Sequence, residues 1–131
     1  MIVIDSSALL DFMVLRAVSP RADELIVGES QLHAPHLIET EMLHVLRRWW
    51  ARRRLEAQRA EAALERLAHL RIVYHEHARL RWRVWQLRAR LTAYDATYVA
   101  LAELLKARLL TSDARLARAA SELVPTVLAT V

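Results

Sequence analysis

The sequence predicts an α/β fold, a three-layer α/β/α sandwich around a central, mainly parallel sheet. Two observations predict it. Short apolar runs alternate along the chain with longer stretches of helical periodicity, and strands joined through helices pair in parallel by right-handed crossovers. A parallel sheet needs helices on both faces, and 55% of the residues are hydrophobic, which is enough to fill such a core. The length of 131 residues suits one domain that spans residues 1–131.

Five short runs rich in apolar residues are the predicted strands. The first opens the chain and ends before Asp5, and the fourth ends at Thr111. In chain order the strands cover residues 1–4, 31–34, 71–74, 108–111 and 124–128. Ligands of open parallel sheets bind beyond the carboxyl ends of the strands, so the residues that follow the strands are the candidates for a functional site.

The helices are predicted from apolar residues that recur with helical spacing, often after a residue that favours a helix start. Ser6 and Ser7 precede the first helix. Pro20 and Gly28 bound the second, and Pro35 opens the third. In chain order the helices cover residues 8–15, 20–28, 35–53, 55–70, 77–91, 95–107 and 113–120. The sixth of these is apolar nearly all round, which is typical of a helix buried in the core.

The composition excludes several classes of function. Gly28 is the only glycine, and P-loops, dinucleotide-binding loops and glycine-flanked serine nucleophiles each need several. The absence of cysteine excludes disulfides, thiolate-bound zinc and cysteine catalysis, and makes a reducing cytoplasm the expected location. No apolar stretch approaches the roughly 18 residues that cross a bilayer, and the N-terminus does not resemble a signal peptide, so no membrane partner is expected. The net charge of +4 permits a nucleic-acid partner, although a GC-rich genome also explains the many arginines.

Four acidic residues lie where the predicted topology places a functional site. Asp5 follows the first strand, and Asp113 follows the strand that ends at Thr111. Glu41 lies two turns into the third helix, and Asp95 begins the sixth. Taken alone, each of the three aspartates is explained as a helix cap, because a carboxylate at a helix start accepts backbone N–H bonds and meets the positive end of the helix dipole.

Taken together, the four acids predict a metal site. Asp95 lies at the mouth of the core and needs compensation for its charge. Glu41 has Val45, and no cation, four residues further along its helix. If the topology brings the four carboxylates to one end of the sheet, they repel one another unless a cation neutralises them. Hard oxygen ligands select Mg²⁺ or Mn²⁺ over zinc, and such an ion can hold a phosphodiester and activate water.

Four segments resemble the motifs of PIN domains of the VapC toxin type, in the family's order and at its usual spacing. They are Val3-Ile4-Asp5-Ser6-Ser7-Ala8-Leu9-Leu10, then Ala34-Pro35-His36-Leu37 with Glu41 and Val45-Leu46-Arg47-Arg48, then Thr92-Ala93-Tyr94-Asp95-Ala96 with Tyr98-Val99-Ala100-Leu101-Ala102, and last Leu110-Thr111-Ser112-Asp113 with Leu116-Ala117 and Ala119-Ala120. Each motif alone is weak, but the ordered set spans almost the whole chain. The segment at 47–50 is bulkier than the family's pattern, which puts in doubt any transfer of an RNA target from a relative.

The resemblance implies a magnesium-dependent endoribonuclease, the toxin of a toxin–antitoxin pair, with a cognate antitoxin whose C-terminal tail occupies the active-site groove. By position, Asp5 and Asp95 match the acids that most directly ligate the metal. Glu41 and Asp113 match the supporting acids. Two further positions, Ser7 and Thr111, match accessory polar residues.

Two other features are candidates for binding. Arg48 and Arg52 fall in line with Glu41 along the third helix and could guide an RNA backbone, unless they form only a solvated helix edge. Trp82 and Trp85 belong to an apolar stripe opposite the expected core stripe of the 77–91 helix, which predicts an interface in a homodimer or with the antitoxin. The alternative is that the preceding long helix folds over this stripe. The six histidines are expected to be scattered surface residues rather than a metal site.

Two other classes of function remain open on the sequence. One is a phosphatase or receiver domain in which Asp5 takes a phosphoryl group. The phosphatase needs a second acid where Ser7 stands, and both need a lysine near a late strand, for which Lys106 is poorly placed. The other is a catalytically silent PIN-like module whose acids only bind a basic partner. The sequence selects no particular RNA, antitoxin, metal count or oligomeric state.

Overall fold

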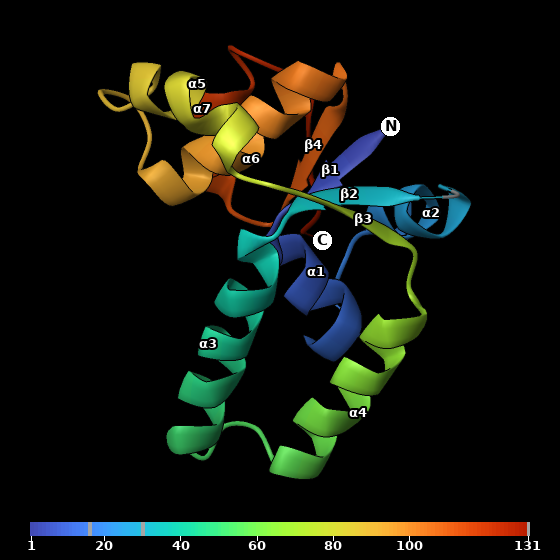
Figure 1. The fold of residues 1–131 in the computed structure, drawn as a ribbon. Coiled ribbons are helices and arrows are strands. Elements are labelled where there is room, and N and C mark those ends of the chain that lie inside the picture. The colour runs from blue at the N-terminus through green and yellow to red at the C-terminus, as the bar shows by residue number, and fades with distance from the viewer. Residues whose placement is uncertain (16, 30, 131) are drawn as a thin grey trace.

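The computed structural model describes residues 1–15, 17–29 and 31–130, which form a five-stranded parallel sheet between two layers of helices (Figure 1). The strand order is β3-β2-β1-β4-β5. The strands are β1 (Ile2–Ile4), β2 (Leu32–Pro35), β3 (Ile72–His75), β4 (Arg108–Thr111) and β5 (Thr126–Leu128). The predicted α/β/α class is confirmed.

The strand order fixes where a ligand site belongs. From β1 the chain builds outward to β3, and it then returns to the other side of β1 to add β4 and β5. The order therefore reverses between β1 and β4, and sheets of this kind bind ligands in the crevice outside the carboxyl ends of the strands at that point. Asp5 follows β1 directly, and Asp113 lies two residues after β4.

Helices cover both faces of the sheet. They are α1 (Ser6–Leu10) with the π-helical turn η1 (Asp11–Leu15), α2 (Pro20–Gly28), α3 (Leu37–Ala51), α4 (Ala57–His69), the 3-10 turn η2 (Ala78–Leu80), α5 (Arg81–Gln86), α6 (Ala93–Leu105) and α7 (Ala114–Ala120). Figure 1 shows α5, α6 and α7 on one side of the sheet and α1, α3 and α4 on the other, with α3 and α4 extending away from it. Among the described residues, no helix is both long and apolar enough to span a membrane.

The position of α6 against the sheet is determined by its packing in the hydrophobic core. Every residue from Ala96 to Ala102 is buried, as the apolar surface of this helix predicts. The helix packs on β1, β2 and β4, whose side chains Ile2, Ile4 and Leu109 are fully buried. Because the core fixes α6, the residues of its first turn are held beside the ends of β1 and β4.

The prediction of one helix over 77–91 is wrong. The chain forms η2, then the short α5, and then turns as far as Leu91. His77 precedes η2 and Leu80 precedes α5, and neither side chain caps the helix that follows it. The first backbone N–H groups of both helices therefore have no side-chain acceptor. Leu80, Leu87 and Leu91 are nevertheless buried, so the predicted core stripe is confirmed although the helix is not continuous.

Other helix starts also differ from the prediction by one or two residues. The third helix begins at Leu37, because Pro35 pairs with His75 as the last residue of β2. The first helix begins at Ser6, two residues early. Asp95 is the third residue of α6 and not its start, because the Thr92 hydroxyl oxygen accepts the Asp95 N–H at 3.2 Å and caps the helix.

Candidate active site

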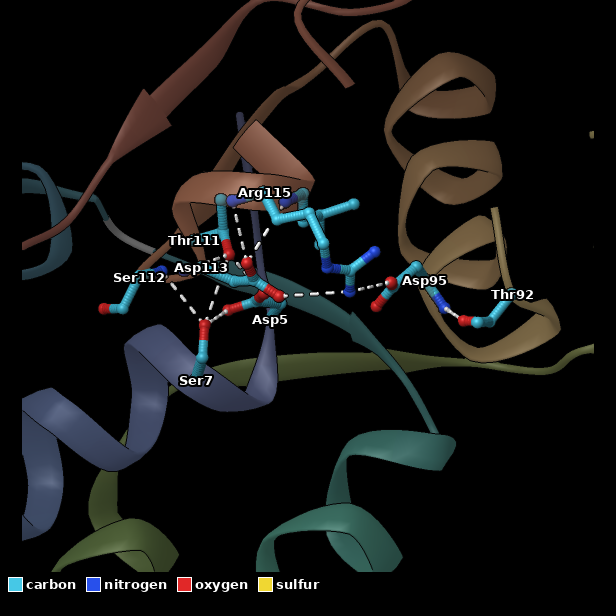
Figure 2. A network of polar contacts seen from close by, with 9 residues as sticks. Asp5, Ser7, Thr92, Asp95, Thr111, Ser112, Asp113 and Arg115 are labelled. Carbon is cyan, nitrogen blue, oxygen red and sulfur yellow. Dashed lines mark hydrogen bonds and ion pairs between the residues drawn. The ribbon is translucent and has the colours of Figure 1, made fainter. Parts of the chain in front are cut away.

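Asp5 is the best-defined acid of the site. It is only 4% exposed, and three donors hold its carboxylate (Figure 2). The Ser7 hydroxyl and the Ala8 N–H donate to Oδ1 at 2.7 and 2.9 Å, and the Thr111 hydroxyl donates to Oδ2 at 2.5 Å. Ser7 and Thr111, predicted as accessory polar positions, therefore orient Asp5 directly.

Burial raises the pKa of Asp5 from its ordinary value of 3.8 to about 6. The hydrogen bonds from Thr111, Ala8 and Ser7 lower the pKa in part, and the negative charge of Asp95 raises it again. A buried carboxylate with a raised pKa gains most from a cation, because the cation offsets both the lost hydration and the repulsion from its neighbour.

Asp113 and Asp95 both accept hydrogen bonds from the guanidinium group of Arg115. Asp113 caps α7 by accepting the backbone N–H groups of Arg115 and Leu116 at 2.9 and 3.2 Å. The exposed Arg115 guanidinium donates to Asp95 at 3.1 Å and to Asp113 at 3.4 Å (Figure 2). Arg115 therefore neutralises part of the negative charge of this pair. Sequence reasoning missed Arg115, although its place two residues after Asp113 in a helix start was a usable signal.

Glu41, on α3, is connected to α6 by a hydrogen bond. It is half-buried on α3, and its carboxylate accepts a hydrogen bond from the Tyr98 hydroxyl of α6 at 2.5 Å. Sequence reasoning missed Tyr98 as well. The available signal was its spacing, because a residue three after Asp95 lies on the same side of the helix.

The chemistry of the side chains at the site suits a magnesium ion, although the side chains are not arranged as a complete set of metal ligands. Within the described ranges, no three His, Cys, Asp or Glu side chains lie close enough together to hold a metal ion. Mg²⁺ is commonly held by one or two carboxylates and keeps several waters, and the site's ligands are carboxylates and hydroxyls, which suit a hard cation.

A hollow of about 320 Å³ lies beside the acids and is lined by Ser7, Ser112 and Asp113 among others. In the described part of the chain, the buried Ser112 hydroxyl has no hydrogen-bond partner.

Comparison with known proteins identifies the family. The family profile described as PIN domain matches residues 2–122. Over 116 residues the chain is 42% identical to Ribonuclease VapC9 of Mycobacterium tuberculosis, and the match covers 88% of each chain. The chain belongs to the PIN domain family, in its VapC branch.

Solved structures support the fold of this VapC-type chain. PAE2754 from Pyrobaculum aerophilum superposes with a TM-score of 0.73 and 24% identity, over 96% of this chain and 83% of that one. A toxin–antitoxin complex from Klebsiella pneumoniae gives a TM-score of 0.58 and 18% identity, over 86% of this chain and 87% of that one. At these identities the likeness concerns the fold alone.

The predicted RNA-binding arginines of the VapC-type chain lie on its surface. Arg48 is exposed on α3, and Arg52 is exposed just past the end of that helix. At 1.5 Å per residue they lie roughly 10 and 16 Å beyond Glu41 along the helix axis. Their role stays a prediction.

The predicted interface stripe of this PIN domain is exposed. Trp82 is 77% exposed and Trp85 is 60% exposed, so the alternative in which another helix covers them is wrong. The Arg88 guanidinium lies 4.4 Å from the centre of the Trp85 ring. What covers the stripe in an assembly stays a prediction.

The expectation of scattered surface histidines is wrong for one pair. His33 is buried on β2, and its Nδ1 lies 2.9 Å from Nε2 of His75 on the neighbouring β3. Burial lowers the pKa of both rings. The pair links two strands of this PIN domain, at a distance that a hydrogen bond between neutral rings explains.

Proposed function

We propose that this VapC-type PIN domain is a Mg²⁺- or Mn²⁺-dependent endoribonuclease, the toxin of a toxin–antitoxin pair. The observation that carries the proposal is the buried Asp5, whose pKa burial raises to about 6 and which lies at the point where the strand order reverses. A carboxylate so placed costs stability unless a cation binds beside it. The name Ribonuclease VapC9, carried by the 42% identical relative, supports RNA as the substrate.

In the proposed site, Asp5 and Asp95 hold the ion directly, and Glu41 and Asp113 support it. The bound ion supplies an activated water and neutralises the leaving oxygen of a phosphodiester. Ser7 and the other two donors to Asp5 fix the direction of its carboxylate, so little reorganisation is needed on binding. Arg48 and Arg52 then guide the RNA backbone along α3, in keeping with the net charge of +4.

The phosphoryl-transfer alternative is weaker in this geometry. Ser7 stands where a phosphatase would need its second acid, and its hydroxyl donates to Asp5. Lys106 caps the C-terminus of α6, a helix of 13 residues whose first turn carries Asp95. It therefore lies roughly 15 to 20 Å along the helix from the acids, too far to serve a receiver site.

The proposed partners are an antitoxin and a second copy of the chain. The 42% identity to a ribonuclease named VapC9 supports the first, and the structure from Klebsiella pneumoniae that shares the fold is a toxin–antitoxin complex. Trp82 and Trp85 support the second, because two neighbouring exposed indoles favour burial and twofold symmetry lets one stripe serve both subunits.

The proposal is tested by incubating the purified chain with mixed RNA in a chelator, and then in excess Mg²⁺, Mn²⁺ or Zn²⁺. We expect cutting with Mg²⁺ or Mn²⁺, none in the chelator and no rescue by Zn²⁺. Cutting that persists in the chelator would refute the metal dependence. A chain that binds Mn²⁺ and a basic partner but cuts no RNA under any of these conditions would be the silent binding module.

A further inference from the structure

Tyr98 connects the core to the acids of the candidate site. Its side chain is 2% exposed and belongs to the hydrophobic core, while its hydroxyl donates to Glu41 Oε1 at 2.5 Å. It lies three residues after Asp95, so both side chains leave the same side of α6. One helix therefore contributes a candidate metal ligand and, one turn later, a donor that reaches across to a second acid on α3.

The Tyr98 hydroxyl gives Glu41 a fixed position. A glutamate side chain is long and samples many rotamers when nothing holds it. On α3 the residue four positions after Glu41 is Val45, so no cation at that spacing holds the Glu41 carboxylate. A hydrogen bond from a hydroxyl to a carboxylate is of the charge-assisted kind, which is stronger than a bond between neutral groups. The donor itself cannot move far, because its ring is packed in the core.

The surroundings keep Tyr98 a donor. Burial raises its pKa far above the ordinary value, and the hydrogen bond to Glu41 and the charges of Glu41 and Asp5 raise it further. The direction of this shift agrees with the hydroxyl as the donor of the bond to Glu41.

We propose that Tyr98 is a positioning residue of the site, which holds the Glu41 carboxylate where it supports the divalent ion bound by Asp5 and Asp95. This inference rests on the proposed function. Residues that orient a metal ligand through a hydrogen bond typically contribute about 10- to 100-fold to metal affinity or activity. Tyr98 acts through Glu41, so we expect no contact with the RNA.

The chain contains a matched control. The Tyr74 hydroxyl of β3 donates to Glu39 Oε1, also at 2.5 Å. Glu39 lies on the same helix as Glu41 but two residues earlier, and residues two apart do not face the same way. Tyr74→Phe therefore removes the same kind of bond from the same helix without touching the acids.

The experiment measures Mn²⁺ affinity by titration calorimetry, and RNA cleavage, for the wild type, Tyr98→Phe and Tyr74→Phe. We expect Tyr98→Phe to bind Mn²⁺ about 10- to 100-fold more weakly, and Tyr74→Phe to stay within about twofold of the wild type. At saturating Mn²⁺ the KM of Tyr98→Phe for RNA should match that of the wild type. In a Glu41→Ala background, Tyr98→Phe should cause no further loss, because its partner is gone.

Two results would overturn the inference alone. One is a Tyr98→Phe protein that binds Mn²⁺ within about twofold of the wild type, and the other is a loss that is equally large in the Glu41→Ala background. Thermal unfolding checks that Tyr98→Phe folds. If it does not, Tyr98→Met, a flexible apolar side chain that fills the core without a hydroxyl donor, must show the same weakened binding. A wild type that itself neither binds Mn²⁺ nor cuts RNA would overturn the proposed function instead, and this inference with it.

Discussion

Replacing Asp5 by asparagine should stabilise the metal-free protein at neutral pH. Asparagine keeps the shape of the side chain and removes the buried charge. Its amide oxygen can accept from Ser7 and Ala8, and the Thr111 hydroxyl can accept the new N–H in place of donating to Asp5. The substitution therefore removes the cost of ionisation and keeps most of the hydrogen bonds.

The magnitude follows from the pKa of Asp5, which burial raises from 3.8 to about 6. Since the folded pKa lies above the unfolded one, the protonated form favours folding. This contribution is complete below about pH 4 and is lost as the pH rises to about 6. Above that pH the ionised carboxyl costs the folded protein about 3 kcal/mol, at 1.36 kcal/mol for each pKa unit. We expect Asp5→Asn to gain about 1–3 kcal/mol at pH 7.5 and almost nothing at pH 4.

The assay is thermal unfolding in a chelator at pH 4, 6 and 7.5. For a chain of 131 residues, 1 kcal/mol shifts Tm by roughly 4 °C, so the gain at pH 7.5 is about 4–12 °C. The exposed Asp23 of α2 provides a control of equal charge, and Asp23→Asn should change stability by less than about 0.5 kcal/mol. An Asp5→Asn protein that melts below the wild type at pH 7.5, or a difference in Tm that is independent of pH, would show that the buried charge of Asp5 does not destabilise the fold.

Three further predictions concern other parts of the molecule. Arg115→Ala should tighten Mn²⁺ binding by a few-fold in dilute buffer, because the guanidinium competes for Asp95, and calorimetry at high salt should show no effect. Burial lowers the pKa of His33, so its contribution to stability is complete above about pH 6.5 and is lost as the pH falls. His33→Leu should therefore flatten the loss of stability between pH 7 and 5 in unfolding experiments, and an unchanged loss would contradict this. Trp82→Glu should turn a sedimenting dimer into a monomer that still cuts RNA, whereas an intact oligomer that no longer binds the antitoxin would place the antitoxin on the stripe.

The fold and the order of the acids could be predicted because both depend on local signals. Apolar runs gave the order of strands and helices, and the rule for ligand sites in parallel sheets selected the residues after β1 and β4. The apolar surface of α6 placed Asp95 beside the core. These features depend on periodicity and chain order, which a single sequence contains.

Spacing marked Arg115 and Tyr98 as candidates, but which acid each side chain contacts could not be predicted, because these contacts join distant segments. The bond from Tyr98 to Glu41 joins residues 57 positions apart, and that from His33 to His75 joins residues 42 apart. The second also depends on the register of β2 against β3. The break in the predicted 77–91 helix is also a matter of tertiary packing. Its leucines are buried in the core although the helix is not continuous, so their spacing alone did not reveal the break. Composition and spacing do not show which distant segments meet.

The binding of the ion by Asp5 and Asp95, which we propose, is tested by the rate at which mixed RNA is cut at saturating Mg²⁺. The proteins compared are the wild type, Asp5→Ala and Asp95→Asn, each first shown to be folded by its melting curve. We expect the wild type to cut RNA, and both variants to lose more activity than the roughly 10- to 100-fold expected for a residue that only orients a metal ligand. Cleavage by either folded variant at a rate near that of the wild type would contradict this proposal.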